Sequence, residues 1–333
     1  MKSNAPRFAY VDLPFSFQME TRRSIRLLLL DTFFILCSLD PSSVISLMLN
    51  SVLPLELAQD LYAHTPITSS ANKRKGDFER ARLTALLLTV IFSRGEPMPV
   101  QYSDQGQLGR NFVDFVLEMI EQSALSRTDD VSDVFIGLML SFNLQFHEYD
   151  VENNFFIERL AMQQGAGHGA KTYTEKILLL LNREDDPAAV VGRDATEKDP
   201  FDDDYDVFPR KGEEAEEDDK RARDLPNSVQ KVIMDMFRHK HARNLFYTND
   251  LYVLIDIIIR QLADIGPEEK RRLRYLQMCQ LVLDYGVPDY TEHLHRFKDL
   301  QERFMRIIEE DDSEERQIVL AMCKSVPAFN SLV

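Results

Sequence analysis

Histidines and a glycine run are the first places in this sequence where chemistry could occur. The histidines form two close pairs, His239 with His241 and His293 with His295. Residues two apart on a helix point to different sides, so neither pair is predicted to bind a metal ion. The glycine run at residues 165–169 follows a predicted helix and lacks the lysine and hydroxyl of a phosphate-binding loop. We therefore expect a linker there.

Nucleophiles and carboxylates give no catalytic pattern either. The three cysteines, Cys37, Cys279 and Cys323, lie far apart in apolar runs, which predicts reduced, buried thiols rather than disulfides or a zinc site. No serine has the sequence context of a nucleophile elbow. The clustered carboxylates fall mostly in residues 183–225, where the pattern offers nothing to fix their geometry. We expect no catalytic, cofactor-binding or metal site, and hence no enzyme.

The charge of the chain is concentrated in one segment. The net charge is −16 over 333 residues, and residues 183–225 alone contribute −9, from 17 acidic and 8 basic residues. An acidic chain repels phosphate backbones and anionic lipid, so we predict neither nucleic-acid binding nor membrane insertion. Residues 183–225 contain too few apolar side chains to offset the entropy of ordering them, and we predict a disordered acidic insertion.

The remaining sequence indicates helix after helix. Apolar residues recur every three or four positions, and glycine and proline are scarce. The predicted helices span residues 25–39, 41–49, 53–62, 78–92, 111–122, 133–146, 152–162, 174–182, 227–237, 251–264, 292–309 and 313–325, and a further helix is predicted to start at residues 267–269. This pattern favours an all-α fold of about a dozen helices in an armadillo- or HEAT-like superhelical stack. We divide it into an extension (1–20), a first helical block (21–182), the acidic insertion (183–225) and a second helical block (226–333).

The N-terminal residues carry no export or membrane signal. Residues 1–19 are polar and interrupted by proline, and the apolar run 27–37 is broken by Asp31 and too short to span a bilayer. A cytoplasmic location is expected.

Charged side chains of the C-terminal helices are the candidates for partner binding. Asp256, Arg260 and Asp264 are spaced four and four, so they either pair with one another between helices or form a polar strip that meets a partner. Two basic clusters follow: Lys270, Arg271, Arg272 and Arg274, and then Arg296, Lys298, Arg303 and Arg306. These clusters are either solvated helix surface or aligned basic ridges for an acidic partner, or for the chain's own acidic insertion.

Several stretches, in this order, resemble one protein family. Residues 53–61 read LPLELAQDL, 95–99 read GEPMP, 174–187 read TEKILLLLNREDDP, 246–265 read FYTNDLYVLIDIIIRQLADI and 316–326 read RQIVLAMCKSV. Together they are similar to the leucine-rich C-terminal domain of the NCK-interacting protein with an SH3 domain, the WISH/DIP family. The resemblance runs from about residue 24 to the end of the sequence.

The resemblance implies a fold and an activity. Family members have an armadillo-like domain that binds the actin-related protein 2/3 complex and activates it without a pre-existing filament, which nucleates linear actin filaments. It also implies contacts with formins and WASP-type proteins, and a location in the actin-rich cortex or endocytic actin patches. We expect partner contacts at Arg260, Arg271, Arg274, Arg296 and Lys298. The alternative is a scaffold that binds formins, WASP-type proteins or endocytic factors without nucleating filaments.

The sequence departs from the family pattern in two respects. Residues 1–333 contain neither the SH3 domain nor the proline-rich region of animal members, so adaptor functions of the SH3 domain are not carried over. The acidic insertion is longer than in the relatives. It either mimics the acidic tails of other activators of the same complex or is a tolerated loop expansion, since long surface insertions cost little free energy.

Overall fold

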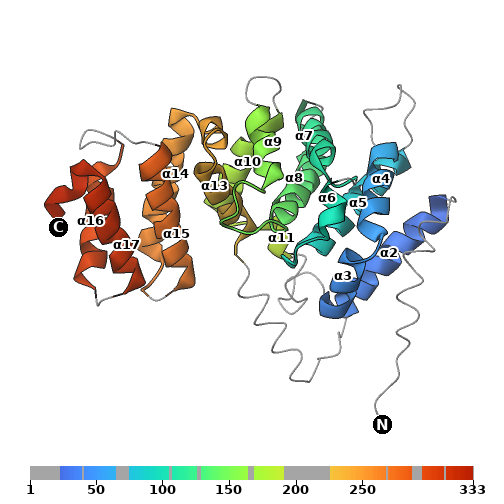
Figure 1. Cartoon of the computed structure of the whole chain (residues 1–333), viewed down its shortest axis with the longest axis horizontal. Helices are drawn as coiled ribbons and strands as arrows, with labels where there is room; N and C mark the ends of the chain where they lie inside the picture. Colours follow the sequence, from blue (N-terminus) through green and yellow to red (C-terminus); the bar gives the residue numbers. More distant parts are fainter. Residues whose placement is uncertain are drawn as a thin grey trace, which may run out of the picture. The chain divides into compact units, whose positions relative to one another are not determined.

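The structure is a computed structural model and describes residues 23–39, 41–64, 75–104, 107–125, 129–163, 169–190, 226–267, 269–286, 295–310 and 313–332. Within these ranges every regular element is a helix and no strand occurs (Figure 1). The predicted all-α class and the stacking of helix on helix are confirmed. The chain forms two compact units: unit 1 lies within Met1–His147 and Asp186–Ser228, and unit 2 within Glu148–Asp185 and Val229–Val333.

Unit 1 is organised around helix α5. Its helices are α2 (Arg23–Leu39), α3 (Pro41–Leu49), α4 (Leu53–His64), α5 (Lys75–Phe92), α6 (Val100–Asp104), α7 (Arg110–Leu125), α8 (Asp129–Asn143) and α11 (Pro187–Val190). Helix α5 packs against α2, α3, α4 and α8, while α7 and α11 both pack on α8. Phe142 lies at the centre, with its ring centroid 5.4 Å from that of Phe92 and 5.5 Å from that of Phe112. Burial of these three rings stabilises the contact between α5, α7 and α8.

A buried carboxylate joins three helices of unit 1. Asp60 on α4 is 3% exposed and accepts a hydrogen bond from Nε of Arg80 on α5 at 2.8 Å. Arg26 on α2 donates to the same carboxylate. A buried charge without such partners would be strongly destabilising, so this cluster fixes the helices in one arrangement.

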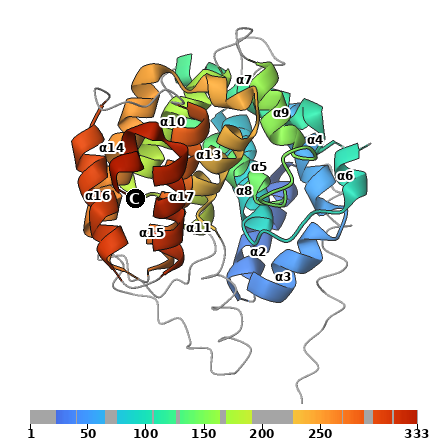
Figure 2. The same cartoon turned by 60° about the vertical axis from the view of Figure 1, so that its left-hand side comes forward.

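Unit 2 is built from two layers of helices that pack on each other. Its elements are α9 (Phe155–Met162), α10 (Gly169–Arg183), α13 (Ser228–Arg238), the 3₁₀ helix η2 (Ala242–Leu245), α14 (Thr248–Asp264), α15 (Lys270–Leu281), a π-helical turn η3 (Val282–Gly286), α16 (Phe297–Glu309), α17 (Glu314–Ser325) and the 3₁₀ helix η4 (Pro327–Leu332). The first residue of α13, Ser228, is assigned to unit 1 and the rest of the helix to unit 2. Helix α14 packs against α10, α15 and α16, and α17 packs against α15 and α16. Figure 2 shows α14 to α17 side by side.

Helix α14 is buried on most of its circumference, as its composition predicts. The buried positions are Leu251, Leu254, Ile255, Ile257, Ile258, Ile259, Gln261 and Leu262. The exposed positions recur at Val253, Asp256, Arg260 and Asp264, which is one stripe of a helix. The helix starts before the predicted residue 251: it already includes Thr248, and Asp250 accepts a hydrogen bond from the main-chain N–H of Tyr247 at 2.9 Å.

Several short elements were not predicted from the sequence. Helix α6 and the 3₁₀ helix η2 are too short to show apolar periodicity, and α11 lies in residues that composition assigned to the acidic insertion. Residues 183–190 are in fact the end of α10, a turn and α11, because Asp186 accepts the main-chain N–H of Ala188 and Pro187 suits the first position of a helix. Helix α15 begins at Lys270, after Glu269 as its N-cap residue.

The two units divide the chain differently from the predicted blocks 21–182 and 226–333. Of the described residues, 148–163 and 169–185 belong with the C-terminal helices in unit 2, while 186–190 and 226–228 belong with the N-terminal helices in unit 1. The predicted extension (1–20), residues 165–168 of the predicted linker 165–169 and residues 191–225 of the predicted insertion lie outside the described residues, whereas Gly169 is the first residue of α10. The predicted disorder of the insertion is therefore not tested.

The cysteines are buried thiols, as predicted. Cys37, Cys279 and Cys323 are free and buried in the helix cores. Burial raises the pKa of the Cys37 and Cys279 thiols to about 12 and that of Cys323 to about 11, which keeps them protonated and unreactive. In the described part of the chain, no group of three or more His, Cys, Asp or Glu side chains is arranged to hold a metal ion.

Membrane-spanning helices were sought in the described ranges only. No single helix there has both the length and the apolar composition to cross a bilayer. The segments Ser43–Leu49 and Leu53–Ala63 would satisfy both criteria only as a pair, and they are bent by 67° at the break between them.

Candidate partner-binding surface

Helices α10 and α14 of unit 2 run side by side in the same direction. At their beginnings, the ammonium group of Lys171 lies over the ring of Tyr247, 5.3 Å from its centroid. Near their ends, Arg260 donates to Asn182. Helix α16 continues the layer, because the two residues that directly precede it bind Asp256 in the middle of α14. We call the exposed face of α10, α14 and α16 the α10–α14–α16 surface.

Arg260 is exposed on this surface and holds the end of α10. Its Nη1 donates to Oδ1 of Asn182 at 3.1 Å, and its Nη2 donates to the main-chain oxygen of Asn182 at 2.8 Å. The last carbonyl groups of a helix have no partner within the helix, and a cation there is favourable to the helix dipole. The described contacts of Arg260 therefore go to α10, rather than to Asp256 and Asp264 as the four-residue spacing had suggested.

Glu184 connects the end of α10 to α14 and α15. Its carboxylate accepts from the side-chain amide of Gln261 at 2.7 Å and from Nη1 of Arg271 at 3.3 Å. Its backbone has φ of 61°, the left-handed conformation in which helices usually place glycine. The N–H groups of Glu184 and Asp185 return to the carbonyls of Leu181 and Leu180, the two bonds of a Schellman motif. The two contacts of its side chain offset the backbone strain, which explains why a glutamate and not a glycine occupies this position.

Arg274 is half-buried and forms a two-pronged ion pair with Glu148. Its Nη2 donates to Oε2 of Glu148 at 2.9 Å, and its Nη1 donates to Oε1. Arg238 approaches the same carboxylate at 3.9 Å. Burial raises the pKa of Glu148, but the hydrogen bond and charge of Arg274, with the charges of Arg238 and Lys231, outweigh it and lower the pKa below its ordinary value. Arg274 thus stabilises the fold from a position with little access to a partner.

The two residues that directly precede α16 bind Asp256. Its Oδ1 lies 2.9 Å from Nε2 of His295 and 3.4 Å from Nε of Arg296. Arg296 also pairs with Asp299 at 3.0 Å and has φ of 59°, so a second non-glycine residue occupies the left-handed region. Lys298, on the next turn of the chain, is exposed and forms no ion pair with any residue that the structure describes.

The five predicted contact residues therefore fall into three groups. Arg260, Arg296 and Lys298 are exposed on the α10–α14–α16 surface. Arg271 is exposed on α15, beside that surface, and is paired with Glu184. Arg274 belongs to the Glu148 ion pair. Arg260, Arg296 and Lys298 thus share one surface, whereas Arg271 and Arg274 form ion pairs within unit 2. Contact with a partner stays a prediction for all five residues.

Comparison with known protein families shows to which family this chain belongs. The model of the SPIN90/Ldb17 leucine-rich domain matches residues 128–300, just over half of the 333 residues. The chain belongs to the SPIN90/Ldb17 leucine-rich domain family. This confirms the family that the sequence motifs indicated.

A relative in budding yeast supports the same conclusion. The chain is 26% identical to Protein LDB17 of Saccharomyces cerevisiae (strain ATCC 204508 / S288c) over 164 residues, which are 47% of this chain and 25% of the relative. The alignment thus spans only a quarter of the length of LDB17, so the activity of that whole protein is not transferred by the similarity.

The family match covers α10, α14 and the first turn of α16 in the candidate surface. The leucine-rich domain extends from the start of α8 into the first turn of α16, and all five predicted contact residues lie within it. The sequence prediction missed Asn182, Glu184 and Glu148, which hold Arg260, Arg271 and Arg274. A signal for the first two existed: the string NRED follows an apolar helix in the segment TEKILLLLNREDDP, where a helix end would usually carry glycine.

Proposed function

We propose that this chain is a regulator of the actin cytoskeleton that binds and activates the actin-related protein 2/3 complex. It would nucleate linear actin filaments without a pre-existing filament. The observation that carries this proposal is the match of residues 128–300 to the SPIN90/Ldb17 leucine-rich domain. The sequence resemblance implies this activity for that domain, and the matched residues include α10, α14 and the first turn of α16.

The proposed mechanism is a shift in the population of two arrangements of the complex. A binder activates the complex only if it prefers the filament-like arrangement of the two actin-related subunits over the splayed one. A surface on packed helices suits this role, because it keeps its shape on binding and so discriminates between two arrangements of a partner. Arg260, Arg296 and Lys298 would supply charged contacts, with Arg271 at the edge of the surface.

The proposed activity involves binding and no covalent step. The chain would act in the cytoplasm, at the actin-rich cortex or at endocytic actin patches, where the partner complex works. Formins and WASP-type proteins are proposed as further contacts.

Actin assembly kinetics test the proposal. The purified chain is added to pyrene-labelled actin and the actin-related protein 2/3 complex, with no WASP-type protein and no filament seeds. We expect a shorter lag than with the complex alone, and no effect of the chain on actin when the complex is absent. Unchanged kinetics with a folded, helical chain would refute activation. If the same chain then captures formins or WASP-type proteins in a pull-down, it is a scaffold that does not nucleate filaments.

A further inference from the structure

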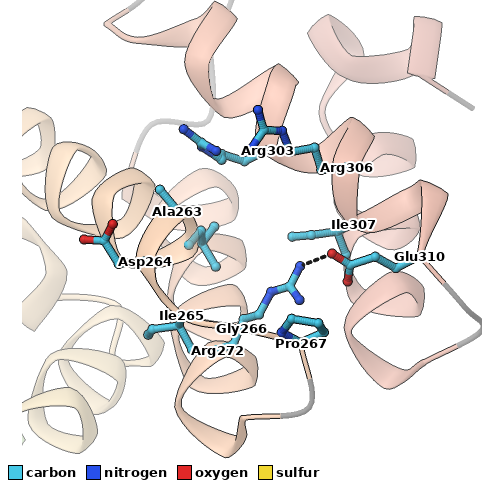
Figure 3. Close-up of a pocket in the computed structure, with 11 residues that line it drawn as sticks. Ala263, Asp264, Ile265, Gly266, Pro267, Arg272, Arg303, Arg306, Ile307 and Glu310 are labelled. Atoms are coloured by element: carbon cyan, nitrogen blue, oxygen red, sulfur yellow. Dashed lines mark hydrogen bonds and ion pairs between the residues drawn. The ribbon is translucent and has the colours of Figure 1, made fainter.

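Unit 2 contains a cleft between the C-terminal parts of α14 and α16. Its volume is about 230 Å³. Its lining residues are Leu262, Ala263, Asp264, Ile265, Gly266, Pro267, Arg272, Arg303, Arg306, Ile307 and Glu310. Figure 3 shows Arg303 and Arg306 extending from α16 on one side of the cleft and Arg272 reaching up from α15 on the other. The residues that α16 contributes lie beyond the matched span 128–300.

The charged groups of the cleft leave an excess of positive charge. Three arginines line it, while the only acidic lining residues are Asp264 and Glu310. Glu310 is engaged by Nη2 of Arg272 at 2.9 Å. The formal charge of the lining residues is therefore +1. Arg272 is paired with Glu310 and Glu315 and Arg306 with Glu302, so Arg303 is the lining arginine that has no acidic partner among the described residues and is available to one monovalent anion.

Two of the arginines have buried N–H groups without an acceptor. Arg272 is 3% exposed, and its Nε and Nη1 form no hydrogen bond within the described residues. Its Nη1 lies 3.3 Å from Oε2 of Glu315, close enough for an ion pair but without hydrogen-bond geometry. Nε of Arg303 is likewise buried without an acceptor, and Arg303 has no ion pair in the part of the chain that the structure describes. Buried donors without partners are costly, and an incoming acceptor would remove that cost.

The size and walls of the cleft restrict the ligand. The volume is below the roughly 300 Å³ at which pockets for whole small molecules begin, so it fits a side chain rather than a nucleotide. Leu262, Ile265 and Ile307 give it apolar walls, which suit the methylene groups of an extended side chain. A phosphate monoester carries close to two negative charges at neutral pH and would exceed the single charge to be balanced.

We propose that this cleft binds the carboxylate side chain of a glutamate or aspartate presented by an acidic peptide segment of a partner protein. Arg303 donates to the incoming carboxylate from one side, and Arg272, fixed by Glu310, lies at the base. Arg306 is 62% exposed in its side chain and paired with Glu302, so it attracts the segment from the rim. This binding is independent of the proposed action on actin.

Fluorescence anisotropy with synthetic peptides tests the cleft directly. The probe is a fluorescein-labelled, end-blocked peptide with one glutamate between leucines in a glycine–serine context. The matched probe has glutamine in its place, and both are measured at about 0.15 M salt, where distant charges are screened. We expect saturable binding of the glutamate peptide and a Kd on the order of tenfold higher for the glutamine peptide. Arg303→Ala should raise the Kd on the order of tenfold, and Arg306→Ala by less.

The control is Lys324→Ala on α17, which removes the same charge from an exposed residue outside the cleft and should leave the Kd unchanged. Urea unfolding of each variant checks its fold, and Arg306→Ala keeps the test valid if Arg303→Ala is unstable. Equal affinity for both peptides, absence of binding, or an equal loss in Lys324→Ala would overturn the proposal. Tighter binding of a phosphoserine peptide would replace the carboxylate by a phosphate. These measurements contain neither actin nor its nucleating complex, so they can fail while the proposed function holds.

Discussion

The carboxylate of Asp186 accepts two hydrogen bonds from Ser228, a residue 42 positions further along the chain. The main-chain N–H of Ser228 donates to Oδ2 at 2.9 Å, and its hydroxyl donates to Oδ1. The N–H of Ala188 also donates to Oδ1, at 3.2 Å. One carboxylate thus satisfies N–H groups at the start of α11 and at the start of α13, where helix dipoles favour a negative charge.

Replacement of Asp186 by alanine should destabilise unit 1. The variant loses three acceptor contacts, two of them to a nearly fully buried residue, Ser228. We expect the free energy of unfolding to fall by about 2 kcal/mol, in the range of helix caps and charge-assisted hydrogen bonds. Urea unfolding followed by circular dichroism measures the change. Asp185→Ala is the matched control. The side chain of this exposed neighbour makes no such contact with any residue that the structure describes, so the variant should shift the value by less than about 0.5 kcal/mol. Equal effects of the two variants would contradict the assigned role.

The ion pair between Glu148 and Arg274 predicts how the stability of unit 2 depends on pH. The folded-state pKa of Glu148 lies below its ordinary value of 4.5. The stabilisation from this carboxylate is therefore complete above the ordinary pKa and is lost as the pH falls through the folded-state pKa. We expect Glu148→Gln to lower the free energy of unfolding by about 2 kcal/mol at pH 7, with a smaller difference from the unmodified chain near pH 3.

The pH dependence is measured by urea unfolding at a series of pH values between 7 and 3. Glu152→Gln removes a nearby carboxylate that is exposed, and it should reproduce the curve of the unmodified chain. If the Glu148→Gln curve ran parallel to that of the unmodified chain over the whole series, the pair would not be the source of the pH dependence.

The left-handed conformation of Arg296 predicts that glycine and alanine substitutions have opposite orders of stability at Arg296 and at Lys298. At φ of 59°, glycine avoids the steric cost that any side chain incurs, so Arg296→Gly should be more stable than Arg296→Ala by about 1 kcal/mol. Both variants lose the same ion pairs, so the difference between their free energies of unfolding reports the backbone strain alone. At Lys298, inside α16, the order should reverse, with alanine more stable than glycine by about 1 kcal/mol. Thermal or urea unfolding of the four variants decides the point, and a higher stability of the alanine variant at both positions would rule out strain at Arg296.

Local features of the fold could be predicted from the sequence because nearby residues determine them. The apolar periodicity of α14 located its buried sides, and Gly95 has the positive φ of 65° expected of a residue just beyond a helix end. Ser313 was placed at the start of the last long helix, and its hydroxyl caps α17 by accepting the N–H of Arg316.

Contacts between distant residues could not be predicted in the same way. Arg271 meets Glu184 across 87 positions, and Arg274 meets Glu148 across 126. The spacing of charges along one helix identified both arginines as exposed candidates, but whether each faces solvent or a carboxylate depends on which helices pack together. The Asp256–Arg260–Asp264 spacing is the clearest case, since tertiary partners at Asn182, His295 and Arg296 are available and the pairing within the helix does not form.

The predicted contact residues should separate into those that bind a partner and those that hold the fold. Lys298→Glu reverses an exposed charge on the α10–α14–α16 surface, and we expect it to weaken binding to the actin-related protein 2/3 complex on the order of fivefold. Its free energy of unfolding should stay within about 0.5 kcal/mol of the unmodified chain. Arg274→Glu places two carboxylates against each other and should lower that free energy by about 3 kcal/mol.

Binding is measured by anisotropy of the labelled chain titrated with the complex, and stability by urea unfolding of the same samples. Lys324→Glu on α17 makes the same charge change elsewhere and controls for the overall charge of an already acidic chain. If Lys298→Glu binds as Lys324→Glu does, Lys298 is not part of the partner-binding surface. If Arg274→Glu is as stable as the unmodified chain but binds weakly, Arg274 contacts the partner directly and its pair with Glu148 is secondary. The two measurements on one set of variants therefore assign each residue, because a contact residue changes affinity alone while a structural residue changes stability first.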